Sequence, residues 1–450
     1  MALSGIQIYK FLPKTNCREC GFPTCLAFAM KLAQQAVELT VCPYVSEEAQ
    51  GALAAAARPP IRLITIGGDG HKIEVGNETV LFRHEKTFFH QPGLVIRVKD
   101  TDSLDDVSKL VAAAAGYSVE RVGMNLKIDG FAIQNASGDA ASFAKCVDAV
   151  KSKADLPLVL MSNDPSAMKA ALEKVGSQKP LIYAATKDNA RQMAELATQY
   201  KCPLAVYEPS GLGELASVVE QITQAGVEDI VLDPGARAFA ESLNTLTQIR
   251  RLAVRQKFEP LGYPVITFPG EGATSLEEET LLAGQQVAKY AGVVVLDHFA
   301  PATVYPLLTL RLNIYTDPQK PIQMTAGIYP ISDPKAGSPL MVTTNFSLTY
   351  FSIAGEVEAS GWPGWLLVCD TEGLSVLTSW AAGKFDAEKI AKTVKQFNVE
   401  SNLNHHKLII PGGVAVLRGE LEEELPDWQI MVGPREAVGI GGYLKTMWQN

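Results

Sequence analysis

Short apolar runs alternate with longer amphipathic stretches through the middle of the chain, from residue 61 to about residue 317. The runs predict β-strands, whereas apolar residues at helical spacing in stretches such as 188–200 and 212–225 predict helices. The candidate strands are 61–66, 94–98, 128–133, 157–161, 181–184, 204–207, 230–232, 265–268 and 293–296. Strands that alternate with helices pair in parallel, and about eight such units in roughly 250 residues suit a closed barrel. We therefore predict a TIM (β/α)8 barrel over residues 58–320.

Polar residues gather where the predicted barrel strands end. They are Asn163, Asp164, Glu208, Asp233, Glu271, Asp297 and His298. Active sites of barrel enzymes lie at these ends, so a bound small molecule is conceivable. However, Asp, Asn and Gly are also the residues that cap helices and form turns, and we favour that interpretation. We expect His298 to be a hydrogen-bonded structural residue.

A third unit, residues 321–450, repeats the alternation with candidate strands 340–343, 365–370, 408–410 and 429–432. Each strand runs into a loop that contains glycine or a hydroxyl residue. Parallel strands would bring these loops to one edge of an open sheet, where doubly wound folds bind their ligands. We predict a Rossmann-like, ligand-binding α/β domain.

The glycines of this unit indicate a large, flat and partly anionic ligand, because they let the backbone approach a broad face closely. They are Gly373, Gly412, Gly413, Gly433, Gly441 and Gly442. A dinucleotide is the obvious rival, but no G-x-G-x-x-G follows a first strand. Each glycine, taken singly, could also serve only as a turn or cap.

Four of the seven cysteines fall near the N-terminus with the spacing C-x2-C-x4-C-x16-C: Cys17, Cys20, Cys25 and Cys42. Four thiolates complete the first shell of a 4Fe-4S cluster or of a structural zinc. Zinc sites usually present two short cysteine pairs, whereas a lone last cysteine beside Pro43 is closer to cluster-binding runs. Pro23 can open a helix, which would place Cys25 at its positive end. We favour the cluster and keep zinc open.

Composition bounds the remaining possibilities. The 450 residues are 47% hydrophobic, which supplies enough apolar side chains for the cores of two or three domains. We predict that the first domain ends near residue 57, at an Ala-rich run followed by Arg58-Pro59-Pro60. A net charge of −9 and a pI near 5.4 argue against nucleic acid or an anionic membrane as main partner. No run is long enough to span a bilayer and no leader is recognisable, so we expect a cytoplasmic protein.

The four-cysteine pattern, the barrel and the segment 370–385 (DTEGLSVLTSWAAGKF) together resemble the large subunit of the corrinoid iron-sulfur protein. Its archaeal counterpart is the gamma subunit of the acetyl-CoA decarbonylase/synthase complex. The resemblance covers essentially the whole chain. It implies a methyl carrier of the anaerobic acetyl-CoA (Wood-Ljungdahl) pathway, not an enzyme with its own catalytic residues; classed as an enzyme, it would be a corrinoid methyltransferase.

In such proteins the four cysteines bind a 4Fe-4S cluster, and the C-terminal unit binds a cobamide. Cobamide contacts are implied for Thr343, Asn345, Thr349, Gly373, Leu374, Ser375, Val376, Thr378, Gly412, Gly413, Gly433, Pro434, Arg435, Ala437 and Gly441. Many corrinoid proteins ligate cobalt through D-x-H-x-x-G, but none of His298, His405 and His406 has Asp two residues before it. A cobamide without a histidine lower ligand favours low-valent Co(I), and the cluster would re-reduce cobalt that has oxidised.

The implied partners are a smaller corrinoid-protein subunit in a heterodimer, a methyltetrahydrofolate:corrinoid methyltransferase, acetyl-CoA synthase/CO dehydrogenase and an electron donor. Two alternatives stay open. The barrel could itself be a pterin-dependent methyltransferase with its own active site. The chain could also be an assembly module whose barrel docks the smaller subunit, which is compatible with the carrier.

Overall fold

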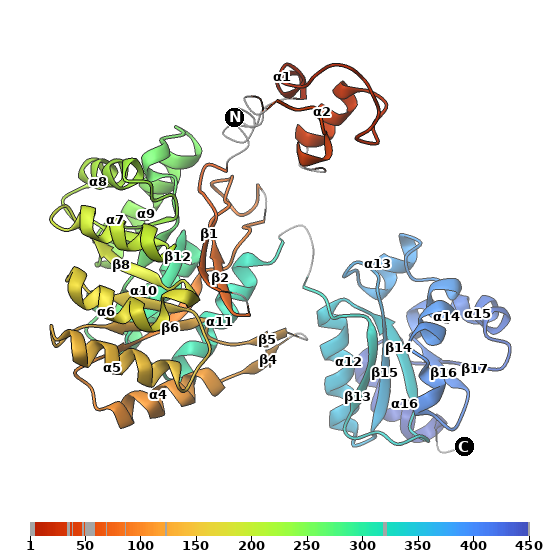
Figure 1. Ribbon diagram of the computed structural model, residues 1–450. Helices are drawn as coiled ribbons and strands as arrows, with labels where there is room; N and C mark the ends of the chain where they lie inside the picture. The colour runs from red at the N-terminus through yellow and green to blue at the C-terminus, as the bar shows by residue number, and fades with distance from the viewer. Residues whose placement is uncertain are drawn as a thin grey trace. The chain divides into compact units, whose positions relative to one another are not determined.

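The computed structural model describes residues 5–33, 37, 39–46, 49, 59–68, 70–85, 87–121, 124–317 and 322–448 (Figure 1). Its internal contacts divide the chain into two compact units. The first takes in Met1–Leu81, Phe89–Ala115 and Asp129–Thr303, and the second Phe82–Phe88, Gly116–Ile128 and Val304–Asn450. Of the predicted junctions at 51–60 and 318–321, residues 51–58 and 318–321 lie outside the described residues, and the bounds of the three domains stay predictions.

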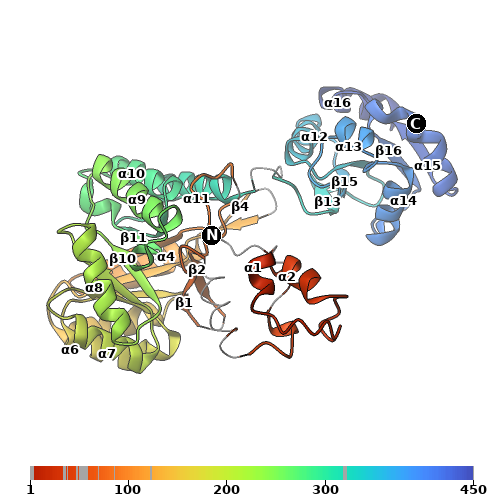
Figure 2. The same ribbon diagram turned by 90° about the horizontal axis from the view of Figure 1, so that it is seen from above.

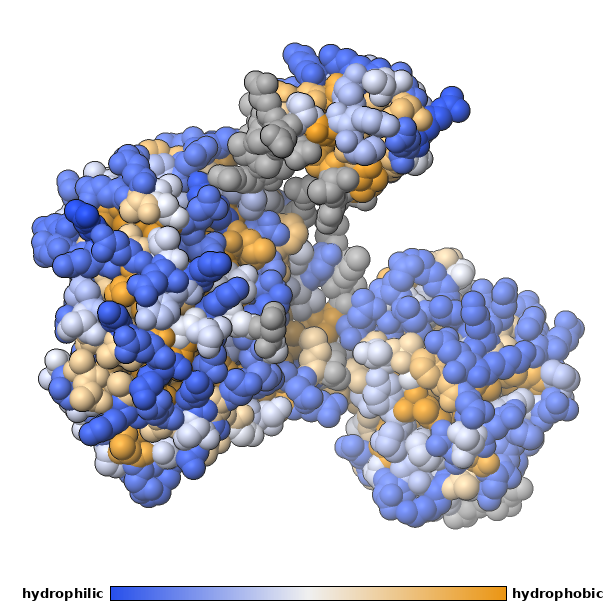
Figure 3. All heavy atoms as spheres, viewed as in Figure 1, coloured by the Kyte–Doolittle hydropathy of each residue, from blue (hydrophilic) through white to orange (hydrophobic). Residues whose placement is uncertain are grey.

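The cysteine-rich segment is built from two short helices, α1 (Gly5–Tyr9) and α2 (Cys25–Ala33), and the 3-10 turn η1 (Leu39–Val41). Ile8 of α1 and Phe28 of α2 are buried in one apolar cluster together with Leu12. The segment also exposes apolar side chains, among them Ile6, Leu26 and Met30 (Figure 3). A small core of this kind leaves much apolar surface open, as expected for so short a segment.

The predicted barrel is confirmed: eight parallel strands close on themselves in the order β10-β11-β12-β3-β6-β7-β8-β9. Of these strands, β6, β8 and β12 are labelled in Figure 1. The strands are β3 (Gly93–Lys99), β6 (Gly130–Gln134), β7 (Leu158–Met161), β8 (Leu181–Ala185), β9 (Leu204–Tyr207), β10 (Ile230–Asp233), β11 (Val265–Thr267) and β12 (Ala291–Leu296). Between and after them in the chain lie α4 (Leu104–Gly116), α5 (Ala140–Lys151), α6 (Pro165–Val175), α7 (Ala190–Tyr200), α8 (Leu212–Gln224), α9 (Phe239–Val254), α10 (Leu276–Ala288) and α11 (Pro301–Tyr315). None of the helices described is long and apolar enough to cross a membrane.

Burial explains why these runs form barrel strands. All side chains of β7 and β10 are buried, as is typical of parallel strands covered on both faces. Acidic caps then begin the following helices: Asp139 accepts from the N–H of Ser142 at the start of α5, and Asp164 accepts from Ser166 and Ala167 at the start of α6.

The predicted barrel strand at 61–66 is wrong. Its residues form β1 (Ile64–Gly67), which pairs antiparallel with β2 (Lys72–Val75) outside the barrel. The N–H of Gly67 donates to Lys179 O at 2.9 Å, and the N–H of Arg62 to Gly262 O at 3.0 Å. Both acceptors precede barrel strands, so the hairpin lies at the amino-terminal end of the barrel. Apolar content alone does not distinguish such a hairpin from a barrel strand.

The C-terminal sheet has five strands in the order β13-β15-β14-β16-β17. All five are labelled in Figure 1, and β13, β15 and β16 are also labelled in Figure 2. The parallel strands are β14 (Leu340–Thr344), β15 (Gly364–Cys369), β16 (Lys407–Ile410) and β17 (Gln429–Val432), each within a residue or so of its prediction. The sequence did not predict β13 (Gly327–Ile331), an antiparallel edge strand that contains Pro330. Proline is tolerated at a sheet edge but obscures the strand in the sequence.

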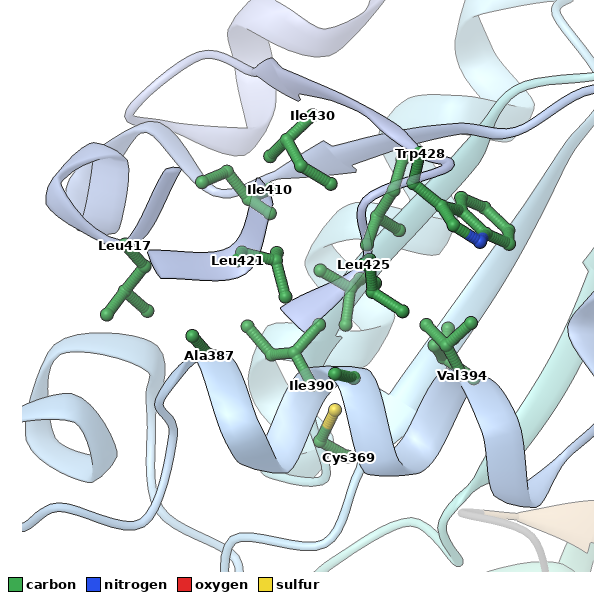
Figure 4. Packing of buried hydrophobic residues seen from close by; sticks show 14 of the residues in the cluster. Cys369, Ala387, Ile390, Val394, Ile410, Leu417, Leu421, Leu425, Trp428 and Ile430 are labelled. Atoms are coloured by element: carbon green, nitrogen blue, oxygen red, sulfur yellow. The ribbon is translucent and has the colours of Figure 1, made fainter. Parts of the chain in front are cut away.

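Successive residues of each parallel strand face opposite sides of this sheet, and each side has its own apolar core. Cys369, Ile410 and Ile430 pack with α14 (Ala387–Gln396) and α15 (Arg418–Glu424) on one side (Figure 4). Leu366 and Ile409 pack with α12 (Ser347–Ser360) and α16 (Ile440–Met447) on the other. The remaining elements are the hairpin β4 (Val119–Arg121) and β5 (Met124–Leu126), the helix α13 (Val376–Ala381) and the short 3-10 turns η2 to η7.

Candidate functional site

Three of the four predicted cluster ligands share one interior. Cys20, Cys25 and Cys42 belong to the apolar cluster of the cysteine-rich segment, with Cys25 and Cys42 each 6% exposed. Cys17 lies on the preceding loop and is exposed. The thiols are therefore shielded on one side and open to solvent at Cys17.

The loop that carries Cys17 is held in place by Asn16. Lys14, Asn16 and Arg18 are all left-handed, with φ of 61°, 51° and 67°. Asn16 Oδ1 accepts from the Cys25 N–H at 2.8 Å, and its own N–H lies 3.4 Å from Cys25 Sγ. Cys25 is the first residue of α2, as predicted.

All four thiols lie close enough to interact. Burial raises the pKa of Cys42, a backbone hydrogen bond involving Tyr44 opposes this, and Cys20, Cys25 and Cys17 raise the pKa further. Repulsion of this kind falls off over several ångströms. Within the described ranges, no three His, Cys, Asp or Glu side chains are grouped as ligands of a single metal ion. Four neighbouring soft donors fit a thiolate-bound metal or cluster chemically, and zinc stays open on this geometry.

The other cysteines should be chemically inert in the folded chain. Burial raises the pKa of Cys146, Cys202 and Cys369 to about 12 each. At pH 8 only about one such thiol in ten thousand is ionised. We expect iodoacetamide to alkylate Cys17 in metal-free protein and to leave these three unmodified until denaturant is added. Peptide mass spectrometry measures this, and rapid labelling of Cys369 in native protein would contradict it.

A pocket of about 430 Å³ lies at the carboxyl ends of β14, β16 and β17. It sits where the strand order reverses between β14 and β16, the position at which open α/β sheets bind ligands. Its walls are Met341, Val342, Phe346, Leu348, Thr349, Ser352, Ile353, Val376, Leu377, Ile409, Ile410, Pro411, Gly413, Gly433, Pro434, Arg435, Glu436, Ala437, Ile440, Tyr443 and Leu444.

Only some of the residues predicted to contact the cobamide line this pocket. The predicted residues that line it are Thr349, Val376, Gly413, Gly433, Pro434, Arg435 and Ala437. The predicted residues outside its lining are Thr343, Asn345, Gly373, Leu374, Ser375, Thr378, Gly412 and Gly441.

Packing accounts for two of the glycines outside the lining. A Cβ on Gly412 would lie 2.4 Å from the carbonyl oxygen of Gly433, so only glycine lets these two strand ends meet. A Cβ on Gly441 would lie 3.1 Å from Ser360 Cβ, where α16 approaches α12. The glycine at position 441 therefore allows these two helices to pack closely, and this explains its presence without a contact to the cofactor.

Two buried hydroxyls at the end of β14 have no partner. Thr343 and Thr344 are both 0% exposed, and neither Oγ1 makes a hydrogen bond within the described residues. Buried polar atoms are nearly always bonded. These hydroxyls follow Met341 and Val342 of the pocket wall in the same strand, but neither threonine itself lines the pocket.

The loop after β15 is more closely bonded than the sequence indicated. The helix that follows this loop, α13, begins at Val376 and has only six residues. Ser375 Oγ and Thr378 Oγ1 bond each other at 2.9 Å. Gly373 is left-handed, with φ of 75°, and its N–H donates to Asn345 Oδ1 at 2.9 Å.

Sequence reasoning missed the apolar walls of the pocket. Leu348 and Leu377 line it although their side chains are 65% and 57% exposed, and Phe346 and Tyr443 line it too. In a sequence, such residues are indistinguishable from core positions. The usable signal is a large apolar residue in the first turn of a helix that follows a parallel strand.

The barrel mouth contains a network of charged side chains, of which the sequence analysis predicted only the acidic members. Arg97 donates to Glu271 Oε1 at 2.7 Å and to Asp297 Oδ2 at 2.5 Å. Arg237 binds both oxygens of Asp233, at 2.8 and 2.9 Å, and Glu271 Oε2 at 2.6 Å. Three of the predicted polar residues therefore converge. The two arginines that join them were not predicted, because one lies inside an apolar strand.

The other polar strand ends are structural, as we favoured. Asp164 caps α6, and Glu208 Oε1 accepts from the N–H of Ser210 at 2.9 Å. His298 Nδ1 lies 2.6 Å from Glu279 Oε2, which confirms its expected role as a hydrogen-bonded residue.

Two family profiles match the chain. One, described as CO dehydrogenase/acetyl-CoA synthase delta subunit, matches residues 63–444, and another, described as a putative Fe-S cluster, matches residues 12–44. The corrinoid/iron-sulfur protein large subunit of Moorella thermoacetica is 46% identical over 446 residues, 99% of each chain. This chain belongs to the corrinoid/iron-sulfur protein large-subunit family.

Archaeal proteins extend this large-subunit family. The acetyl-CoA decarbonylase/synthase complex subunit gamma of Methanothermobacter thermautotrophicus is 35% identical over 457 residues and covers 99% of both chains. The gamma subunit of Archaeoglobus fulgidus is 36% identical over 466 residues, covering 99% of this chain and 98% of its own. The profile is described as a delta subunit, yet these end-to-end relatives of the large-subunit family are gamma subunits.

Proposed function

We propose that this chain is a methyl carrier of the acetyl-CoA pathway that binds a 4Fe-4S cluster and a cobamide. End-to-end similarity to a corrinoid/iron-sulfur protein large subunit carries the proposal. When bound, the cobamide supplies a cobalt that takes up and gives up a methyl group, and the cluster supplies the electron that restores oxidised cobalt. The chain itself binds and orients these groups.

The cysteine-rich segment supplies the cluster ligands Cys17, Cys20, Cys25 and Cys42. The profile match at residues 12–44 favours iron and sulfur over zinc. Asn16 orients Cys25 through its two bonds to that residue. Exposure of Cys17 leaves one corner of the segment open to an electron donor.

The Rossmann-like C-terminal domain supplies the cobamide site. The unpaired hydroxyls of Thr343 and Thr344 suit polar groups of the cofactor, and the exposed side chains of Leu348 and Leu377 suit its apolar ring face. Arg435 is an exposed cation in the lining, as a partly anionic ligand requires.

Histidine contacts support a cobamide without an imidazole lower ligand. His405 is bonded through both ring nitrogens, to Ser338 O at 2.9 Å and to the Lys407 N–H at 3.1 Å. His406 stacks at a tilt against Trp428. In the sequence His71 does follow Asp69 at two residues' distance, but Glu74 stands where D-x-H-x-x-G has glycine.

The partners we propose follow from the methyl carrier role. They are a smaller subunit, a methyltetrahydrofolate:corrinoid methyltransferase, acetyl-CoA synthase/CO dehydrogenase and an electron donor, all in the cytoplasm. The rival site, a pterin methyltransferase in the barrel, would occupy the barrel mouth. There Asp233 and Glu271 are already bonded by arginines, which supports the carrier over this alternative.

Metal content tests the proposal. Protein purified without oxygen and reconstituted with iron, sulfide and cobamide should contain about four iron atoms and one cobalt per chain. Elemental analysis and the visible absorption spectrum measure this. A colourless product with neither metal would exclude the carrier, and binding of methyltetrahydrofolate to a cobalt-free chain would favour the barrel enzyme.

A further inference from the structure

One side chain, Asn345, ties together the segments that surround the end of β14. It is 3% exposed. Its Oδ1 accepts from the Thr371 N–H at 2.9 Å, from Thr371 Oγ1 at 3.0 Å and from the Gly373 N–H at 2.9 Å. The turn after β15 therefore donates three hydrogen bonds to a single side-chain oxygen.

The nitrogen of the same amide holds two further groups. Asn345 Nδ2 donates to Gln323 Oε1 at 2.8 Å and to Asp370 Oδ1 at 3.1 Å. A side-chain amide has two donor hydrogens and one acceptor oxygen, so all of its bonding capacity is used inside the protein. Asn345 has no capacity left for the direct cobamide contact that the resemblance implied.

The turn that Asn345 holds does not adopt its shape easily. Glu372 and Gly373 are both left-handed, with φ of 58° and 75°, and this conformation is unfavourable for glutamate. The turn leads within a few residues to Val376 and Leu377, which line the pocket. Its position therefore sets where this wall of the pocket stands.

A second part of the lining is connected to the same side chain. Gln323 forms an isolated bridge with Phe346, and the Ser347 hydroxyl donates to Ile322 O at 2.6 Å. Phe346 lines the pocket and follows Asn345 directly. The amide thus connects two segments that both contribute to the lining of the pocket.

We propose that Asn345 is a positioning residue for the cobamide, which fixes the separation of the Phe346 wall and the Val376–Leu377 wall. The inference rests on the proposed function, because it concerns the same site. It assigns Asn345 no contact with the cofactor and makes the 370–373 turn the element through which it acts.

The experiment compares cobamide affinity in full-length protein, with aquocobalamin as probe and the visible spectrum as readout. Asn345→Ala should weaken binding about tenfold or more, since the turn loses the three hydrogen bonds that it donates to this side chain. Asn404→Ala, at an exposed asparagine of the same domain, is the matched control and should bind like the unmodified chain.

A pair of substitutions that exchanges the amide and the carboxylate distinguishes a positioning role from a general loss of folding. Asn345→Asp keeps the accepting oxygen but places a second carboxylate beside Asp370, so binding should weaken. Adding Asp370→Asn supplies an amide donor opposite the new carboxylate at position 345. The cobamide affinity should then return to within about threefold of that of the unmodified chain. A rescue of this kind would not follow from lost folding.

Hydrogen exchange tests the same idea without cofactor. The Thr371 and Gly373 amides should be protected in the apo protein and exchange faster in Asn345→Ala. Unchanged affinity and unchanged exchange in Asn345→Ala, or no rescue by Asp370→Asn, would overturn the inference. If the unmodified chain binds no aquocobalamin while the exchange difference is present, the proposed function fails instead.

Discussion

Cys17→Ala abolishes reductive reactivation of the cobamide and leaves methyl transfer from pre-reduced protein largely intact. Cys17 is exposed, so its removal opens no cavity and costs little stability. It is nevertheless one of the four cluster ligands that we propose, and its loss should lower the reactivation rate by more than about 100-fold. Iron analysis, reduction of the cobalt followed by its spectrum, and a single-turnover methyl transfer assay measure the three quantities.

Thr15→Ala is the matched control for this variant, because Thr15 is exposed on the same loop and supplies no thiol. It should retain iron and both activities. If Cys17→Ala loses reactivation and methyl transfer together while its circular dichroism is unchanged, the cluster takes part in transfer and the division of labour is wrong.

Arg237→Met destabilises the barrel by about 3–5 kcal/mol, since it leaves a buried charge uncompensated. Asp233 is 0% exposed and accepts two bonds from Arg237. Burial alone would lower the pKa of Arg237, but its bonds to Asp233 and the charge of that carboxylate raise it overall. Chemical denaturation followed by far-ultraviolet circular dichroism measures the free energy of unfolding.

The chain carries an internal control for this measurement. All five tryptophans lie between residues 362 and 448, so their fluorescence reports on the C-terminal sheet and should shift little. Arg191→Met removes an exposed helix pair with Glu195 and should change stability by less than about 0.5 kcal/mol. A change below about 1 kcal/mol in Arg237→Met would contradict the importance of the network.

Acid should weaken the same network. Burial alone would raise the pKa of Glu271, but Arg237 and Arg97 hold it below its ordinary value of 4.5. A carboxylate with a lowered folded-state pKa stabilises the protein above its unfolded-state pKa, and the contribution is lost as pH falls through the folded value. The stability difference between the unmodified chain and Arg237→Met should therefore shrink below about pH 4.5.

The barrel could be predicted because its signal is local and repeated. Most buried strands are apolar runs, and some are followed by a helix with an acidic cap, such as Asp139 or Asp164. The failure at 61–66 has the same origin: Ile64 and Ile66 are buried as deeply as barrel residues, although they belong to a hairpin. Local pattern reports burial, not the partner strand.

The sites divide in a similar way. Cysteine spacing predicted the four N-terminal ligands that we propose, because those residues lie close in the chain and one of them begins a helix. The pocket lies where three strands end that are far apart in sequence, so its glycines were recognised but its apolar walls, Phe346 and Leu377, were not. Whether an apolar side chain faces a core or a ligand depends on what packs opposite it.

By itself, the sequence predicted the parallel strands of both sheets, the barrel and the candidate thiol donors, since all three depend on residues near one another in the chain. Only the tertiary structure decided that Arg97 and Arg237 bond the carboxylates of the barrel mouth, that the hydroxyls of Thr343 and Thr344 make no hydrogen bond within the described residues, and that the Asn345 amide is fully bonded inside the protein. Each of these features depends on which polar atoms come into contact. Strand order and register determine those contacts, and no local sequence pattern encodes them.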